Sequence, residues 1–107
     1  MRMMSDQIEL ILPEQLEKRL TDDHEDLLIV DVREDDEVSS GKIAEAIHIP
    51  LGQIPDRLEE LDLSKLVITV CRSGRRSETA AEYLQGQGYR VQNMIGGMMK
   101  WTGDIQA

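Results

Sequence analysis

Short apolar runs alternate along the chain with polar segments in which apolar residues recur every three or four positions. The short runs have the length of strands, and the longer segments show helical spacing. We expect strands at residues 8–12, 27–30, 47–49, 66–70 and 89–95. Strands that alternate with helices form open parallel sheets with right-handed connections. The pattern therefore predicts an α/β fold: an open five-stranded parallel sheet flanked by helices on both faces.

The segments between the strands predict helices of unequal length. Pro13 suits the first turn of a helix, and Leu16 and Leu20 follow at helical spacing. Residues 51–61 carry an apolar stripe but contain Pro55, so that helix should break or start at the proline. We also expect a short helix that opens with the acidic residues 35–37, a helix at 77–85 and a last short helix at 98–102.

Length and charge limit what the chain can be. Its 107 residues, 40% of them hydrophobic, suit one domain spanning residues 1–107, with residues 1–7 as a flexible N-terminus. The formal net charge of -9 argues against nucleic acid and anionic membranes as partners. No apolar run suits a signal peptide or a bilayer span, and one cysteine excludes an internal disulfide. We expect a soluble cytoplasmic protein.

The strand at residues 66–70 ends at the only cysteine of the chain. Cys71 is followed by a loop of Arg72, Ser73, Gly74, Arg75 and Arg76. A lone cysteine at a strand end is usually a small buried hydrophobic residue. Three arginines so close together repel one another unless they are solvated or share an anion, which favours a functional interpretation. Because helix N-termini and neighbouring cations lower the pKa of a thiol, the segment predicts a thiolate at an anion-binding loop.

Two other strand ends should lie near this loop. The carboxyl ends of parallel strands meet at one edge of a sheet, so residues 31–34, 71–76 and 96–97 should meet at one site. Asp31 and Arg33 are best explained as a structural ion pair beside that site, because an acid and a base at a strand end brace each other and the nearby backbone.

The remaining candidates favour structural roles. His48 is flanked by two isoleucines and is expected to be a hydrogen-bonded structural residue rather than a general base. With His24 as the only other histidine there is no convincing zinc ligand set, and we expect no metal. Met98, Met99 and Trp101 are candidates for a wall of the site, although core packing suits most of them better.

The sequence Cys-Arg-Ser-Gly-Arg-Arg-Ser at residues 71–77 resembles the active-site loop of the rhodanese family, sulfurtransferases that carry sulfane sulfur on a cysteine. Three further motifs occur in the family's order. They are Asp31-Val32-Arg33, Gly41-x-Ile43-x-x-Ala46-x-His48-Ile49-Pro50, and Gly96-Gly97 followed by Trp101. The resemblance covers nearly the whole chain, from residue 8 to residue 101, and implies the strand order 1-5-4-2-3.

The resemblance implies a double displacement at Cys71. The thiolate takes the outer sulfur of thiosulfate or another sulfane donor, sulfite leaves, and cyanide or a thiol then removes the sulfur from the persulfide. Backbone N–H groups of residues 72–76 would hold the persulfide sulfur, and Arg76, with Arg72 or Arg75, would hold the sulfonate of the donor. No metal or organic cofactor is required. A thioredoxin-like or sulfur-carrier protein is a further partner that the resemblance suggests.

The chain departs from the family pattern at three positions away from the loop. Lys42 stands where the family usually has His, Glu45 where it usually has Gly, and Val38 where an aromatic residue is common. We expect these changes to affect the substrate entrance and local turn geometry more than the chemistry.

Three other functions stay open. Cysteine-dependent phosphatases and arsenate reductases place five residues between Cys and Arg, whereas four separate Cys71 from Arg76 here, and Ser77 occupies the longer-loop position. The smaller ring disfavours that chemistry. Noncatalytic interaction modules of the rhodanese family usually lack the cysteine that this chain has. A protein-to-protein sulfur relay would use the same Cys71 persulfide.

Overall fold

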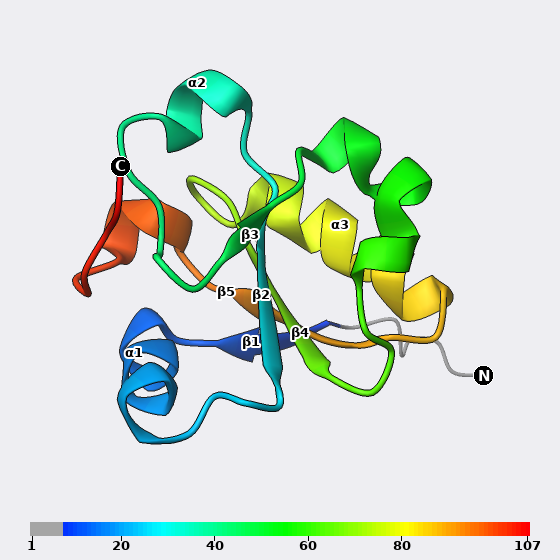
Figure 1. Ribbon diagram of the computed structural model, residues 1–107, viewed down its shortest axis with the longest axis horizontal. Coiled ribbons are helices and arrows are strands. Elements are labelled where there is room, and N and C mark those ends of the chain that lie inside the picture. The colour runs from blue at the N-terminus through cyan, green and yellow to red at the C-terminus, as the bar shows by residue number, and fades with distance from the viewer. Residues whose placement is uncertain (1–7) are drawn as a thin grey trace.

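The computed structural model describes residues 8–107, so the expectation of a flexible segment at residues 1–7 lies outside the described part of the chain. Strands and helices alternate along it (Figure 1). The strands are β1 (Glu9–Ile11), β2 (Leu27–Asp31), β3 (Ile47–His48), β4 (Leu66–Val70) and β5 (Arg90–Met94). The helices are α1 (Pro13–Asp22), α2 (Asp35–Val38) and α3 (Arg75–Gly86), with two 3₁₀ helices, η1 (Leu51–Glu60) and η2 (Gly97–Lys100).

The strands form one parallel sheet in the order β1-β5-β4-β2-β3. The prediction of an open five-stranded parallel sheet is confirmed, and the order is the one that the rhodanese resemblance implies. Strand β4 is central, with β2 on one side and β5 on the other. Its carboxyl end therefore lies between the ends of two neighbouring strands, where open parallel sheets bind their ligands.

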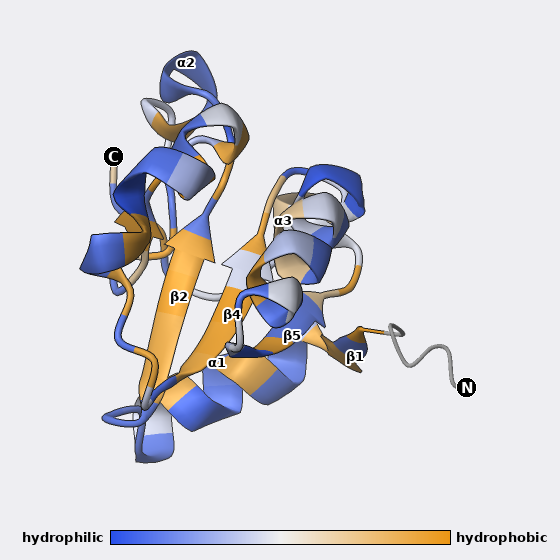
Figure 2. Cartoon of the chain, turned by 90° about the vertical axis from the view of Figure 1, so that its right-hand side faces the viewer, coloured by the Kyte–Doolittle hydropathy of each residue, from blue (hydrophilic) through white to orange (hydrophobic). Residues whose placement is uncertain are grey.

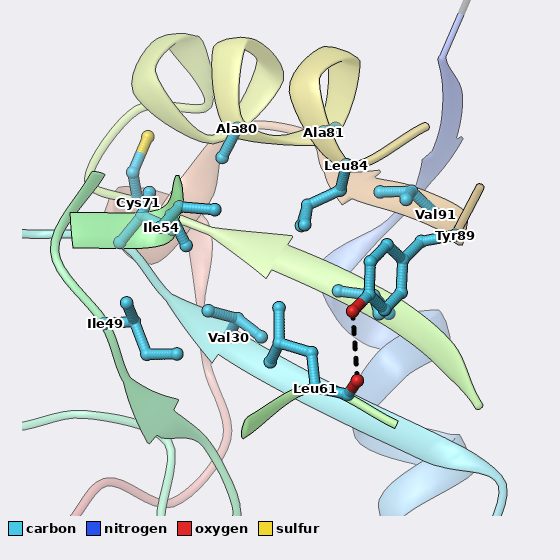
Figure 3. Packing of buried hydrophobic residues seen from close by; sticks show 12 residues of the cluster. Val30, Ile49, Ile54, Leu61, Cys71, Ala80, Ala81, Leu84, Tyr89 and Val91 are labelled. Atoms are coloured by element: carbon cyan, nitrogen blue, oxygen red, sulfur yellow. Dashed lines mark hydrogen bonds between the residues drawn. The ribbon is translucent and has the colours of Figure 1, made fainter. Parts of the chain in front are cut away.

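Helices cover both faces of this sheet. Strand residues Val30, Val67 and Val91 pack on one face against Ile54 of η1 and Ala80, Ala81 and Leu84 of α3 (Figure 3). Ile29, Ile68 and Met94 pack on the other face against Leu16 of α1, Met98 of η2 and Trp101. Figure 2 shows β2 and β4 as almost continuous hydrophobic strands. Strands covered on both faces need apolar side chains in both directions, which explains their uninterrupted apolar runs.

Helix α3 begins at Arg75, two residues before the expected start at Ser77. The reason is Gly74, which adopts a φ of 104° that few other residues accept. The chain turns at this glycine, and the helix begins at the next residue. Arg75 and Arg76, which the sequence analysis assigned to the loop, therefore belong to the first turn of the helix.

The segment expected as a helix at 51–61 is the 3₁₀ helix η1, interrupted at Arg57 with φ of -126° and ψ of 23°. Pro55 removes a backbone donor and crowds the preceding turn, which disfavours a regular α-helix. The expected break therefore falls two residues after the proline. None of the helices within residues 8–107 is long and apolar enough to cross a membrane.

Candidate active site around Cys71

Cys71 lies directly after the central strand β4, at the carboxyl edge of the sheet. None of its surface is exposed: its exposed fraction is 0%. The sulfur points away from the sheet and towards the start of α3 (Figure 3).

The loop after Cys71 turns backbone N–H groups towards the sulfur. The Gly74 N–H donates to Cys71 Sγ at 3.0 Å. The carbonyl groups of the loop are engaged elsewhere, because the Cys71 and Arg72 oxygens accept hydrogen bonds from the Met98 and Met99 N–H groups at 2.8 and 3.0 Å. A loop that directs its carbonyls outward and its N–H groups inward forms a concave site for a negative atom.

Two buried polar side chains of the sheet connect it to this loop through hydrogen bonds. Asn93 of β5 donates from Nδ2 to the Gly74 carbonyl oxygen at 3.0 Å. The Thr69 hydroxyl of β4 donates to Asn93 Oδ1 at 3.3 Å. Both side chains are buried in an apolar layer, where unpaired polar groups are costly. Their pairing therefore fixes the position of Gly74 relative to the sheet.

The pKa of Cys71 lies below that of an ordinary thiol. Burial raises the pKa, but the hydroxyl and N–H of Ser77 and the N–H groups of Gly74 and Ser73 lower it by a larger amount. A lower pKa increases the fraction of thiolate at neutral pH, and the thiolate is the nucleophilic form.

The sequence analysis named Ser77 at the end of the loop motif but did not predict it as a site residue. It is fully buried in the first turn of α3. Its Oγ has no hydrogen-bond partner among the described residues, and its side chain and N–H both contribute to the lowered pKa of Cys71. A buried hydroxyl without another partner gains from turning towards a sulfur that carries negative charge. Ser77 therefore completes the set of donors around Cys71.

We predict that Ser77→Ala raises the pKa of Cys71 and slows its alkylation severalfold at neutral pH, because the variant loses a donor that favours the thiolate. The rates of parent and variant should converge at high pH, where both thiols are ionised. Iodoacetamide alkylation measured across pH gives both results.

Ser73→Ala is the matched control for this prediction. The Ser73 side chain is exposed, and only its N–H lowers the pKa of Cys71. That N–H remains in the alanine variant, so its alkylation profile should match the parent. Equal profiles for Ser77→Ala and the parent would mean that the Ser77 hydroxyl does not act on the sulfur.

The three arginines of the loop differ in their surroundings. Arg72 and Arg75 are exposed, and neither has an ion-pair partner within residues 8–107. Arg76 is partly buried, and its Nη1 and Nη2 donate to the two carboxylate oxygens of Glu37 at 2.7 and 2.8 Å. That these arginines bind the anionic end of a donor stays a prediction. Arg76 could do so only while it is also paired with Glu37.

Asp31 and Arg33 form the ion pair expected at the end of β2. Arg33 Nε and Nη2 donate to Asp31 at 3.0 and 2.8 Å, and both side chains are buried. Arg33 Nη2 also donates to the Gly41 carbonyl oxygen at 2.8 Å. His48 Nε2 lies 2.6 Å from the Arg33 carbonyl oxygen. These contacts brace the chain on either side of α2, next to the Cys71 loop.

A hollow of about 280 Å³ lies beside the Cys71 loop. Its lining residues are Arg33, Glu37, Ser40, Arg72, Met98 and Met99. Met99 is 60% exposed, whereas Met98 and Trp101 pack against the hydrophobic core. The two methionines thus line this hollow, and Trp101 lies outside its lining; that they form a wall of the Cys71 site stays a prediction.

The three departures from the rhodanese pattern lie outside the lining of this hollow. Lys42 Nζ donates to the Ala46 carbonyl oxygen at 2.6 Å, and its backbone pairs with Gln106. Lys42 therefore stabilises the turn in which it lies. Glu45 is exposed and Val38 is partly buried.

The arrangement as a whole defines a class of protein. A buried cysteine of lowered pKa stands at the carboxyl edge of a parallel sheet, inside a loop of inward N–H groups and at the start of a helix. Such an arrangement can stabilise a thiolate and is suited to nucleophilic chemistry by cysteine. The family model described as Rhodanese-like domain matches residues 12–104, and the chain belongs to that family.

Similar proteins agree with this assignment. A putative sulfurtransferase of Bacillus subtilis, YtwF, is 46% identical over 82 residues, which are 77% of this chain and 80% of the relative. The thiosulfate sulfurtransferase GlpE of Pseudomonas syringae is 37% identical over 75 residues, or 69% of this chain and 71% of that protein. The crystal structure of a rhodanese-like domain protein from Staphylococcus aureus has a TM-score of 0.86 at 33% identity, covering 92% of this chain and 97% of its own.

Proposed function

We propose that this protein is a sulfurtransferase that moves sulfane sulfur from thiosulfate or a persulfide donor to a thiophilic acceptor through a persulfide on Cys71. The observation that carries the proposal is the surroundings of the sulfur. Cys71 Sγ is buried and accepts the Gly74 N–H at 3.0 Å, and hydrogen-bond donors of Ser73, Gly74 and Ser77 lower the pKa of its thiol, so the sulfur has donors suited to a negative charge.

In the first half of the proposed reaction, the Cys71 thiolate attacks the outer sulfur of thiosulfate. A bond forms between the two sulfurs, the S–S bond of the donor breaks, and sulfite leaves with its electron pair. The N–H groups of residues 72–76 and the Ser77 hydroxyl hold the negative outer sulfur of the new persulfide, much as an oxyanion hole holds oxygen.

In the second half, an acceptor attacks the outer sulfur and regenerates the thiolate. When cyanide is the acceptor the product is thiocyanate, and when a thiol is the acceptor the product is its persulfide. The acceptor thiol belongs either to a small molecule or to a protein of the thioredoxin or sulfur-carrier type, and in the latter case the domain acts as a sulfur relay. Such chemistry needs a reduced cysteine, so a reducing compartment such as the cytoplasm is part of the proposal.

The proposed ligands of the anionic end of the donor are Arg72, Arg75 and Arg76. Arg72 in the loop and Arg75 in the first turn of α3 are exposed and have no ion-pair partners within residues 8–107, so their charges are available to a sulfonate. Arg76 shares its charge with Glu37. Asp31 and Arg33 support the site as a buried ion pair.

The proposal predicts sulfur transfer without phosphatase activity. A phosphoryl centre with its oxygens is broader than one sulfur, and the four residues between Cys71 and Arg76 form a smaller ring than the five of the phosphatase loops. We expect measurable thiocyanate formation from thiosulfate and cyanide, and hydrolysis of an aryl phosphate no faster than background. A protein that hydrolyses the phosphate faster than it transfers sulfur would contradict the proposal.

A further inference from the structure

Glu37 and Arg76 join two segments that are 39 positions apart in the sequence. Glu37 belongs to α2 and Arg76 to the first turn of α3. Arg76 donates from Nη1 to Oε1 at 2.7 Å and from Nη2 to Oε2 at 2.8 Å. Glu37 Oε1 also accepts the Glu34 N–H at 2.9 Å. A guanidinium with two parallel bonds to one carboxylate is held firmly, so α2 is tied to the helix that follows the Cys71 loop.

The Glu37–Arg76 pair is charged at every pH at which sulfur transfer is measured. The hydrogen bond from Arg76, opposed by burial and supported by the Glu34 N–H, lowers the pKa of Glu37 to about 2. The same hydrogen bond raises the pKa of Arg76 above its ordinary value. Glu37 therefore stays a carboxylate and offsets the charge of Arg76.

Glu37 also lines the hollow beside the Cys71 loop, together with Arg33 and Arg72. The charge of Arg33 is offset by Asp31. Of the arginines that line the hollow, Arg72 alone lacks an ion-pair partner within residues 8–107. The ion pair engages both Nη atoms of Arg76, so a small dianion that entered the hollow would meet Arg72 as its one unpaired cation. One cation only partly neutralises a ligand with two negative charges.

We propose that Glu37 determines donor choice: it disfavours thiosulfate and favours an organic persulfide. This inference rests on the proposed function of Cys71. The Cys71 thiolate attacks the terminal sulfur of R–S–SH, the S–S bond of the donor breaks, and the electron pair leaves on R–S⁻. The product on the protein is Cys71–S–SH. The organic group R lies against Met98 and Met99 in the wall of the hollow, a contact that thiosulfate cannot make.

The test compares two donors in four proteins. The donors are thiosulfate and 2-hydroxyethyl persulfide, which carries no sulfonate. The proteins are the parent, Glu37→Gln, Glu37→Gln/Arg76→Ala and Asp36→Asn. Asp36 is an exposed acid of the same helix, so its variant loses the same formal charge without changing the ion pair. The quantity measured is kcat/KM for each donor, with cyanide as the acceptor.

We expect Glu37→Gln to raise kcat/KM for thiosulfate about tenfold and to leave the persulfide value within about twofold. The gain should be absent in Glu37→Gln/Arg76→Ala, because it depends on the released guanidinium, and absent in Asp36→Asn. The parent itself, whose folding is not in question, should use the persulfide with the higher kcat/KM.

Three results would overturn the inference while leaving sulfur transfer intact. They are a parent that prefers thiosulfate, equal changes for both donors in Glu37→Gln, and an Asp36→Asn variant that matches Glu37→Gln. A parent that transfers sulfur from neither donor would overturn the proposed function and this inference with it.

Discussion

Replacing Cys71 with serine should reduce sulfur transfer by at least about 10³-fold while leaving the fold in place. Serine nearly preserves the size of the side chain, and its oxygen accepts the Gly74 N–H that now donates to Sγ at 3.0 Å. It cannot form a persulfide, because a hydroxyl does not carry sulfane sulfur under these conditions. Thiocyanate formation from thiosulfate and cyanide measures the loss.

Denaturant unfolding of the same variant separates lost chemistry from lost structure. The free energy of unfolding should fall by about 1 kcal/mol at most, since one buried atom is exchanged for a smaller one that keeps the hydrogen bond. Turnover in Cys71→Ser clearly above the uncatalysed background would show that another group carries the sulfur.

Replacing Gly97 with alanine should have the second largest effect, although Gly97 bears no reactive group. A Cβ atom there would lie 2.5 Å from the Cys71 carbonyl oxygen and closer still to that of Arg72. Both are backbone atoms and cannot rotate away, and the φ of 63° at Gly97 is unfavourable for alanine. We expect a loss of about 2–4 kcal/mol in the free energy of unfolding.

Sulfur transfer should fall at least tenfold in Gly97→Ala, as a rough estimate, because the hydrogen bonds from the Met98 and Met99 N–H groups to the loop carbonyls are broken. Gly86→Ala is the control. A Cβ at Gly86 meets no atom within 4 Å, and the residue ends a helix, so we expect parent-like activity and unchanged or slightly higher stability. Parent-like behaviour of Gly97→Ala would mean that η2 does not hold the loop in shape.

Most of the fold follows from local patterns in the sequence. Leu66–Val70 and Leu27–Asp31 are apolar enough to be covered on both faces, and such runs predict buried parallel strands directly. Strand order is not a local property, and its agreement with the structure comes from the family resemblance. The predicted start of α3 was wrong by two residues. Neighbouring arginines predict a loop, but Gly74 allows the helix to begin at the next residue, Arg75.

The site was predictable where its residues are contiguous and hidden where they come from distant segments. Cys71 and its loop form one short motif. Glu37 lies in an acidic run that is typical of a solvated helix start, and its partner Arg76 is 39 positions away. Asn93 follows Gln92 in β5, and its pairing with the Gly74 carbonyl depends on the register of the sheet. Contacts of this kind require the fold before they can be recognised.

Intact mass of the parent protein after incubation with thiosulfate tests the central claim most directly. The protein is desalted and analysed before and after addition of cyanide, with Cys71→Ser treated in parallel. We predict a gain of one sulfur atom on the parent, its loss when cyanide is added, and no gain on Cys71→Ser. A parent whose mass does not change, or a gain that persists in Cys71→Ser, would contradict sulfur transfer through a Cys71 persulfide.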